Sequence, residues 1–310
     1  MKWIKKGLIY SVSKFNDLAY SHTHKPKPLL INENILRIYF GIRDKQSRTR
    51  TTFIDVDPND LKKIIYEHPK PVLDLGPIGA FDDSGANVSC VLKNGSDIYM
   101  YYIGWNPSTT VHTRNSIGLV ISHDKGITFK RQWYGPILDR NMEEPFYTGA
   151  VFVMKEGEIW KMWYTSGTEW KEISNKLEIC YRIKYVESSD GIHWNRKNVS
   201  CINPKHDLEA IASPAVIKVN RIYKMWYCYR NIDNFRNDKE KGYKIGYAES
   251  KDGIKWNRLD QEMDLKPSNY GWDSKMVAYP AVFELKGTLY MIYNGNDFGA
   301  SGFGYAVLEK

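Results

Sequence analysis

Five segments of similar sequence follow one another along the chain at an almost constant spacing. Each is a short run of apolar and aromatic residues that closes on an aromatic anchor, and the anchors are Phe40, Tyr102, Tyr164, Tyr227 and Tyr293. Successive anchors are 62, 62, 63 and 66 residues apart, so five periods account for all 310 residues. Similarity at a fixed period indicates one supersecondary unit that is repeated until neighbouring copies bury each other's apolar faces.

Each anchor lies in the second strand of a predicted β-hairpin. In the fourth unit the strands cover residues 213–219 and 222–229, with Asn220-Arg221 as the two-residue turn, and the fifth unit repeats this pattern. A second hairpin, with glycine in its turn, follows within residues 117–129, 183–194 and 245–256. Glycine supplies the positive φ that such a turn needs. Four antiparallel strands in a repeated unit are typical of a propeller blade.

The last unit has too few residues for its fourth strand. The N-terminal segment Lys2-Trp3-Ile4-Lys5 resembles His193-Trp194-Asn195-Arg196 and Lys255-Trp256-Asn257-Arg258, which form the fourth strands of earlier units. We therefore expect it to pair with the final strand and close the ring, because closure removes two exposed sheet edges. The sequence predicts an all-β fold: one domain over residues 1–310, a five-bladed β-propeller of four-stranded antiparallel blades.

Composition narrows the classes of function. No apolar run approaches 18 residues, so we expect no membrane span. The first six residues hold no apolar stretch, so we expect no secretory signal and predict a cytoplasmic protein. The four cysteines form no C-x-x-C pair and are expected to be buried thiols, with no metal and no cofactor. The net charge is +8, and the lysines are scattered along the sequence instead of clustered. Scattered lysines are typical of solubility and of protection of sheet edges from aggregation, so no nucleic-acid partner is expected.

Polar residues gather where the predicted blades open onto one mouth. The chain enters the first strand of a blade from this face and returns to it after the second strand. Amides and carboxylates bond the hydroxyl groups of sugars, and an indole covers their C–H face. The predicted substrate-binding residues are Arg43, Asp44, Trp105, Asn106, Arg230, Asn294 and Asn296 after the anchors, and His24, Glu209 and Tyr279 beside the first strands. The alternative is that Asn, Asp and Gly stand here only because turns favour them.

Acidic residues recur just before the first strands of the units. Asp83, Glu144 and Asp273 approach the predicted axis from three different blades, and we take them as the candidate catalytic residues. Carboxylates in unlike surroundings can divide the roles of acid and base at a glycosidic bond. Surface solvation is the simpler explanation for acids in such loops.

The corresponding segment of the first unit is basic. It reads His22-Thr23-His24-Lys25-Pro26-Lys27-Pro28. Three interpretations stay open: a solvated loop, a cationic subsite for an anionic sugar, phosphate or nucleotide, and a metal site built on His22 and His24.

The sequence resembles the five-bladed propeller superfamily that includes glycoside hydrolase families 32, 43, 62, 68 and 130. It is most similar to uncharacterised glycosidase-like proteins found among bacterial surface-polysaccharide genes. The resemblance covers the whole sequence and is carried by residues 81–85, 101–105, 188–194, 271–273 and 293–296. It implies a carbohydrate or sugar-nucleotide ligand.

The catalytic pattern of family 43 is not present. In that family an Asp-Pro pair in the first blade carries the general base, and the matching pair here is Lys27-Pro28. The positions that match its other two acids fall at Ala86 or Asn87 and at Tyr147. Residues 122–129 also resemble the Asp-box of sialidases, which is a structural turn.

Two functions follow from this sequence. The first is a carbohydrate-active enzyme that acts on a glycosidic bond in bacterial surface-glycan metabolism, as a hydrolase, transferase or phosphorylase. The alternative is a non-catalytic propeller that binds a glycan or a sugar nucleotide, which the missing family 43 acids favour. Because one fold hosts many functions, the site decides between them.

Overall fold

The computed structural model describes residues 1–12 and 17–309, and it consists almost entirely of β-strands, which confirms the all-β prediction. Within these residues the helical elements are the 3-10 helix η1 (Asp260–Glu262) and the four-residue α1 (Asn296–Gly299). The strands are β1 (Trp3–Tyr10), β2 (Ser21–Asn32), β3 (Ile35–Arg43), β4 (Thr49–Asp57), β5 (Asp60–Glu67), β6 (Gly85–Asn94), β7 (Asp97–Asn106), β8 (Arg114–Ser122), β9 (Lys130–Arg131), β10 (Tyr147–Glu156), β11 (Ile159–Ile173), β12 (Lys176–Ser188), β13 (Asn195–Ser200), β14 (Glu209–Val219), β15 (Ile222–Asn231), β16 (Lys244–Ser250), β17 (Asn257–Arg258), β18 (Ala278–Leu285), β19 (Thr288–Asn294) and β20 (Phe303–Leu308).

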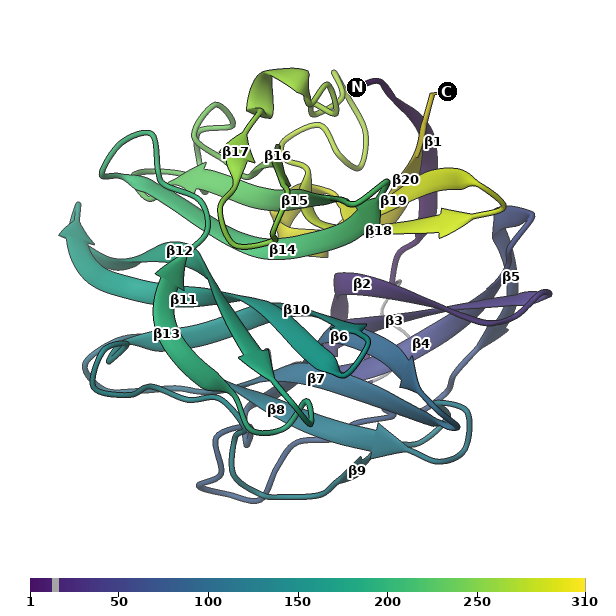
Figure 1. The fold of residues 1–310 in the computed structure, drawn as a ribbon, viewed down its shortest axis with the longest axis horizontal. Coiled ribbons are helices and arrows are strands. Elements are labelled where there is room, and N and C mark those ends of the chain that lie inside the picture. The colour runs from purple at the N-terminus through teal and green to yellow at the C-terminus, as the bar shows by residue number, and fades with distance from the viewer. Residues whose placement is uncertain (13–16, 310) are drawn as a thin grey trace.

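The strands form antiparallel groups of four. Three are separate sheets, in the orders β10-β11-β12-β13, β14-β15-β16-β17 and β1-β20-β19-β18. The groups β2 to β5 and β6 to β9 are joined through the residue pair Thr49–Gly85 between β4 and β6. Figure 1 shows the groups in succession around the molecule, with the first strand of each toward the middle. These strands, β2, β6, β10, β14 and β18, contact one another in turn, β18 and β2 included, and we name the sheets after them.

The aromatic anchors lie in the core between neighbouring sheets. All five are 1% exposed or less. Phe40 of the β2 sheet packs against Phe303 of the β18 sheet at 5.3 Å between ring centroids, and Tyr164 belongs to a cluster with Tyr101 of the preceding sheet. The 62-residue period therefore places one large ring in each gap between sheets, which explains why the repeat is aromatic.

A serine–aspartate turn ties three of the sheets to the sheet before them. Ser122 Oγ accepts the amide N–H of Gly126 (2.8 Å), and Asp124 accepts the amide of Thr128 (3.0 Å). The carbonyl of Gly126, which has a φ of +80°, accepts the hydroxyl of Tyr39 from the preceding sheet (2.8 Å). Equivalent hydrogen bonds from an aromatic side chain to a glycine carbonyl join Tyr101 to Gly191 and Trp163 to Gly253. The Asp-box-like segment is thus a structural turn, as its sequence resemblance implies.

The first strand completes the last sheet. Strand β1 pairs antiparallel with β20, with Trp3 opposite Leu308. Trp3 is buried against Trp226 of the neighbouring β14 sheet, at 5.9 Å between ring centroids. The N-terminal segment therefore contributes a strand and a core side chain.

The cysteines are Cys90, Cys180, Cys201 and Cys228, and all are buried free thiols, as predicted. In the described residues there is no helix of the length and apolarity needed to cross a membrane.

Candidate functional site

Three of the innermost strands carry the same local irregularity. Lys25-Pro26 in β2, Ser213-Pro214 in β14 and Tyr279-Pro280 in β18 each interrupt the register of the ladder. Proline has no N–H for the ladder, which favours a bulge. The residue before each proline has a positive φ, of 51° to 55°, which side chains other than glycine's adopt at a cost. All three of these residues line one cavity.

This central cavity has a volume of about 350 Å³ and is lined by residues from all five innermost strands. That volume is in the range of pockets for small ligands. Trp105 forms part of its wall, and the indole occupies the space that a side chain at Gly85 would fill. Tyr147, Tyr181 and Tyr279 add further aromatic surface. The site thus combines ring faces with the polar groups described next.

The charged groups of the cavity are cationic. Lys25, Arg43 and His24 line it, whereas no aspartate or glutamate is among its lining residues in the described part of the protein. Burial, together with the neighbouring ammonium of Lys27, lowers the pKa of Lys25 to about 7. Burial and the guanidinium of Arg43 also hold the pKa of His24 well below its usual value. The imidazole is therefore neutral near pH 7, and Arg43 with part of Lys25 carries the positive charge.

Several buried polar atoms of the cavity have no partner. These are Nε2 of His24, Nε of Arg43 and Oδ1 of Asn87, judged against the residues that the structure describes. A buried donor or acceptor without a partner costs about 1–3 kcal/mol. All three atoms belong to residues that line the cavity, and the atoms themselves are buried behind its surface.

Four of the ten predicted binding residues line this cavity, namely His24, Arg43, Trp105 and Tyr279. Arg230 lies behind the wall, with its guanidinium carbon 5.6 Å from the ring centres of both Tyr181 and Tyr243. It is buried at 3% exposure, and its guanidinium carbon lies 3.6 Å from the centre of the Phe235 ring.

The other five predicted binding residues are outside the lining and bond the protein itself. Asp44 pairs with Arg50 and Arg48, Asn106 donates to Ala80 O, Glu209 pairs with Arg258, Asn294 bonds Lys25, and Asn296 accepts the amide of Lys275. Asn294 has an indirect part in the site, because its Oδ1 accepts the amide of Lys25 (2.8 Å) and so supports the bulge. A binding role for the remaining four stays a prediction.

The three candidate catalytic acids are not among the cavity-lining residues. Glu144 accepts the hydroxyls of Tyr164 (2.8 Å) and Ser166 (2.6 Å), and Asp273 accepts the hydroxyl of Tyr293 (3.0 Å) and pairs with Lys5. The same pairing of anchor hydroxyl and carboxylate recurs at Tyr102–Asp82 and Tyr227–Asp260. Asp83 accepts the amide of Gly79 and the hydroxyl of Ser84 in its own loop. A catalytic role for the three acids stays a prediction.

Sequence reasoning overlooked Ser213. Its hydroxyl lies 3.0 Å from Nζ of Lys25, and the lysine Nζ also lies 3.9 Å from the centre of the Tyr279 ring. The sequence feature that could have identified it is a residue followed by proline near the start of three innermost strands. Asn87, one of the two residues matched above to an acid of family 43, and Tyr147, matched to another, also line the cavity.

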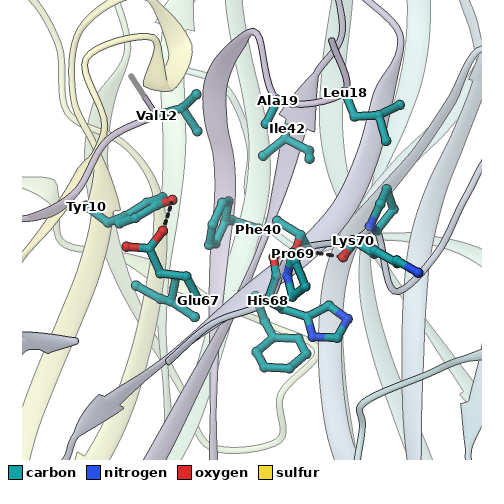
Figure 2. Close-up of a pocket in the computed structure, with 14 residues that line it drawn as sticks. Tyr10, Val12, Leu18, Ala19, Phe40, Ile42, Glu67, His68, Pro69 and Lys70 are labelled. Atoms are coloured by element: carbon teal, nitrogen blue, oxygen red, sulfur yellow. Dashed lines mark hydrogen bonds between the residues drawn. The ribbon is translucent and has the colours of Figure 1, made fainter. Parts of the chain in front are cut away.

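A second cavity, of about 260 Å³, lies beside β3 (Figure 2). Its walls are largely apolar, with Phe40, Ile42 and Leu18 around it and the hydroxyl of Tyr10 bonded to Glu67 (3.2 Å). Val12, which lines it, is the last residue described before position 17, and we place no site there.

Within the described ranges, no group of three or more His, Cys, Asp or Glu residues is arranged to hold a metal ion. The rings of His22 and His24 are in contact, 5.0 Å apart between centroids and tilted by 37°. Burial and the nearby Arg43 lower the pKa of His22 to about 4.

Comparison with known proteins gives relatives and a fold. No protein-family model matches the sequence. Two Mycobacterium tuberculosis proteins, the uncharacterized proteins MT1551 (strain CDC 1551 / Oshkosh) and Rv1502 (strain ATCC 25618 / H37Rv), are each 35% identical over 311 residues, which covers 100% of this protein and 100% of each relative.

Solved structures of similar fold include glycoside hydrolases. One glycoside hydrolase matches with a TM-score of 0.73 at 15% identity, over 98% of this protein and 91% of that one. A thermostable family-43 glycoside hydrolase matches with a TM-score of 0.66 at 17% identity, over 96% and 90%. The Bombyx mori family-32 β-fructofuranosidase BmSUC1 matches with a TM-score of 0.65 at 13% identity, over 96% and 63%. Taken together, these matches show that the protein belongs to the family of the two mycobacterial proteins and has a β-propeller fold like that of the glycoside hydrolase structures just named.

Proposed function

We propose that the central cavity binds an anionic carbohydrate, such as a uronic acid, a sugar phosphate or a sugar nucleotide. The observation that carries this proposal is the charge of the cavity, which has Lys25 and Arg43 in its wall and no carboxylate among the lining residues described. An anion pairs with the guanidinium of Arg43, and the sugar ring packs on Trp105. The protein then uses a glycosidase-like scaffold for recognition of a charged glycan.

The scaffold that we propose is a single domain of five blades. The five groups of four strands, the contacts of β18 with β2, and the pairing of β1 with β20 support it. In this arrangement the innermost strands of the five blades surround the axis, so residues from every blade line one cavity.

Replacement of Arg43 by methionine tests the binding site. We expect glucuronate to bind at least 10-fold more weakly to Arg43→Met, since a hydrogen bond to a charged group contributes about 1.5–3 kcal/mol. Titration calorimetry at pH 6.5 with glucuronate, and with glucose as the uncharged comparison, measures the effect. Lys45→Met removes the same charge from an exposed surface lysine and should leave the affinity unchanged. Equal loss in both variants, or tighter binding of glucose, would contradict the proposal.

A second candidate is cleavage of a glycosidic bond, because the structures of similar fold include glycoside hydrolases. The acids for this reaction are Asp83, Glu144 and Asp273, and only Asp83 has a partly exposed side chain among them. A role in surface-glycan metabolism belongs to this candidate as well.

The variant Asp83→Asn separates the two candidates. If Asp83 is an acid or base, turnover of aryl glycosides should fall at least about 100-fold, because the amide cannot transfer the proton. If the cavity only binds, the wild-type protein shows no turnover on the same panel and the variant binds glucuronate normally. A chromogenic assay across the panel, with thermal melting to verify folding, gives the answer.

A further inference from the structure

Two side chains with complementary chemistry meet in the central cavity from different sheets. Nζ of Lys25, on β2, lies 3.0 Å from Oγ of Ser213, on β14. Both residues line the cavity, and Ser213 is 5% exposed. A serine hydroxyl within hydrogen-bond distance of a base is the arrangement that nucleophilic catalysis requires.

We propose that Ser213 and Lys25 form a nucleophile–base pair, and that the cavity hydrolyses an acyl ester carried by a carbohydrate. The choice of a carbohydrate ester rests on the proposed function, whereas the reactivity of the pair does not. Serine–lysine pairs are an established variant of the serine–histidine arrangement on unrelated folds.

The backbone holds both side chains in place. Ser213 has a φ of 55°, its N–H donates to Oγ1 of Thr165 (3.1 Å), and the next residue is proline. A strained turn that presents the hydroxyl is also the way other serine nucleophiles are displayed. Lys25 has a φ of 51°, and its N–H is fixed by Asn294 at 2.8 Å. Its Nζ rests on the Tyr279 ring, which limits the lysine to one direction.

The amine of Lys25 can act as a base near neutral pH. Burial is the largest cause of its lowered pKa, of about 7, and Lys27 on the same strand lowers it further, while the thiol of Cys228 on β15 opposes this. His24, also on β2, faces the same cavity and stays neutral. Tyr279 on β18 keeps its proton, because burial raises its pKa well above the usual value.

The reaction proceeds in two balanced halves. Oγ of Ser213 attacks the ester carbonyl carbon while its proton passes to the neutral amine of Lys25. The bond from this carbon to the sugar oxygen then breaks, and the ammonium returns the proton to that oxygen, which leaves as the sugar hydroxyl. Water attacks the acyl-serine in the same way, with Lys25 taking its proton and giving it to Oγ of Ser213, so a carboxylic acid is released.

The cavity also supplies groups for the negative charge that develops on the carbonyl oxygen. Arg43 and Thr165 line the same cavity, and their guanidinium and hydroxyl groups are hydrogen-bond donors. Preorganised donors of this kind stabilise a transition-state oxyanion.

The experiment uses the whole protein with a fluorophosphonate probe and with p-nitrophenyl acetate. We expect peptide mass mapping to place the phosphonyl group on Ser213, and labelling to be absent in Ser213→Ala. Lys25→Arg keeps the positive charge but does not lose its proton near pH 7, so labelling and ester hydrolysis should fall at least 100-fold while glucuronate still binds. Ser89→Ala removes the serine at the bulge of β6 and should leave the labelling of Ser213 unchanged.

The pH dependence distinguishes the two uses of Lys25. Labelling needs the neutral amine, so its rate should rise as the pH rises through about 7. Binding of glucuronate needs the ammonium, so the affinity should fall through the same range. Opposite slopes in one protein support both proposals.

Three results would overturn the inference. They are labelling that spares Ser213 at pH 8.5, labelling of Lys25→Arg at the wild-type rate, and a labelling rate that does not change with pH. If one of these results is found and glucuronate still binds, the proposed function stands and only the acyl transfer is wrong. If glucuronate does not bind either, both the proposed function and the acyl transfer are wrong. Mapping on the wild-type protein decides the matter even if Ser213→Ala fails to fold.

Discussion

Deletion of residues 1–8 is expected to lower the thermal midpoint by about 10 °C or more, or to make the protein aggregate. The deletion removes most of β1, so β20 becomes an exposed edge that can pair with other molecules. It also removes Trp3, which is 5% exposed, and loss of a buried tryptophan alone costs about 3–5 kcal/mol. The ion pair of Lys5 with the buried Asp273 is lost as well. Circular dichroism melting and light scattering measure the outcome.

The control for this deletion is Lys2→Ala. Lys2 pairs with Glu309 at the same edge, but the side chains are 60% and 49% exposed, and such a pair contributes about 0–1 kcal/mol. Its melting curve should match that of the wild type within about 2 °C. A truncated protein that melts within the same 2 °C and stays monomeric would show that β1 is dispensable and that the fold does not depend on it.

The change Glu144→Ala is expected to destabilise the protein by about 3–5 kcal/mol, because it leaves cations buried without their counter-charge. Glu144 is 1% exposed and accepts hydrogen bonds from Tyr164 and Ser166. The ammonium of Lys184 lies 3.6 Å away and the guanidinium of Arg196 lies 3.9 Å away, and both are largely buried. Urea denaturation followed by tryptophan fluorescence measures the loss.

Glu143→Ala serves as the matched control, since Glu143 is the exposed neighbour with the same side chain. It should change the free energy of unfolding by less than about 0.5 kcal/mol. The contrary result is a Glu144→Ala protein of wild-type stability that has lost glycosidase turnover. That result would assign catalysis to Glu144 and would favour the hydrolase over the binding protein.

Much of the architecture follows from the sequence alone. The spacing of the anchors predicts repeated antiparallel units, and each anchor is buried between two sheets. The similarity of the segment around Trp3 to the segments around Trp194 and Trp256 predicts its pairing with the last strand, and Trp3 lies opposite Leu308. These inferences work because strand pairing and core packing are repeated locally, so each copy of the unit reports on the others.

The candidate site could be predicted only in part. Arg43 and Trp105 were found from their positions after the anchors, and both line the cavity. Asp44 and Asn106 have the same sequence signal, yet they bond Arg50 and a loop carbonyl instead. In a loop, the direction of a side chain depends on the partner that it meets, and the spacing of residues does not contain that information.

The sequence by itself determined the repeat, the strand alternation and the aromatic interfaces, because these depend on residues close together or one period apart. Only the tertiary structure decided that Lys25 and Ser213, which are 188 positions apart, meet at 3.0 Å in a cavity lined by no described carboxylate. The physical reason is that a bulge before proline turns each of these side chains toward the middle of the molecule. Their meeting then depends on how all the sheets are arranged around that point.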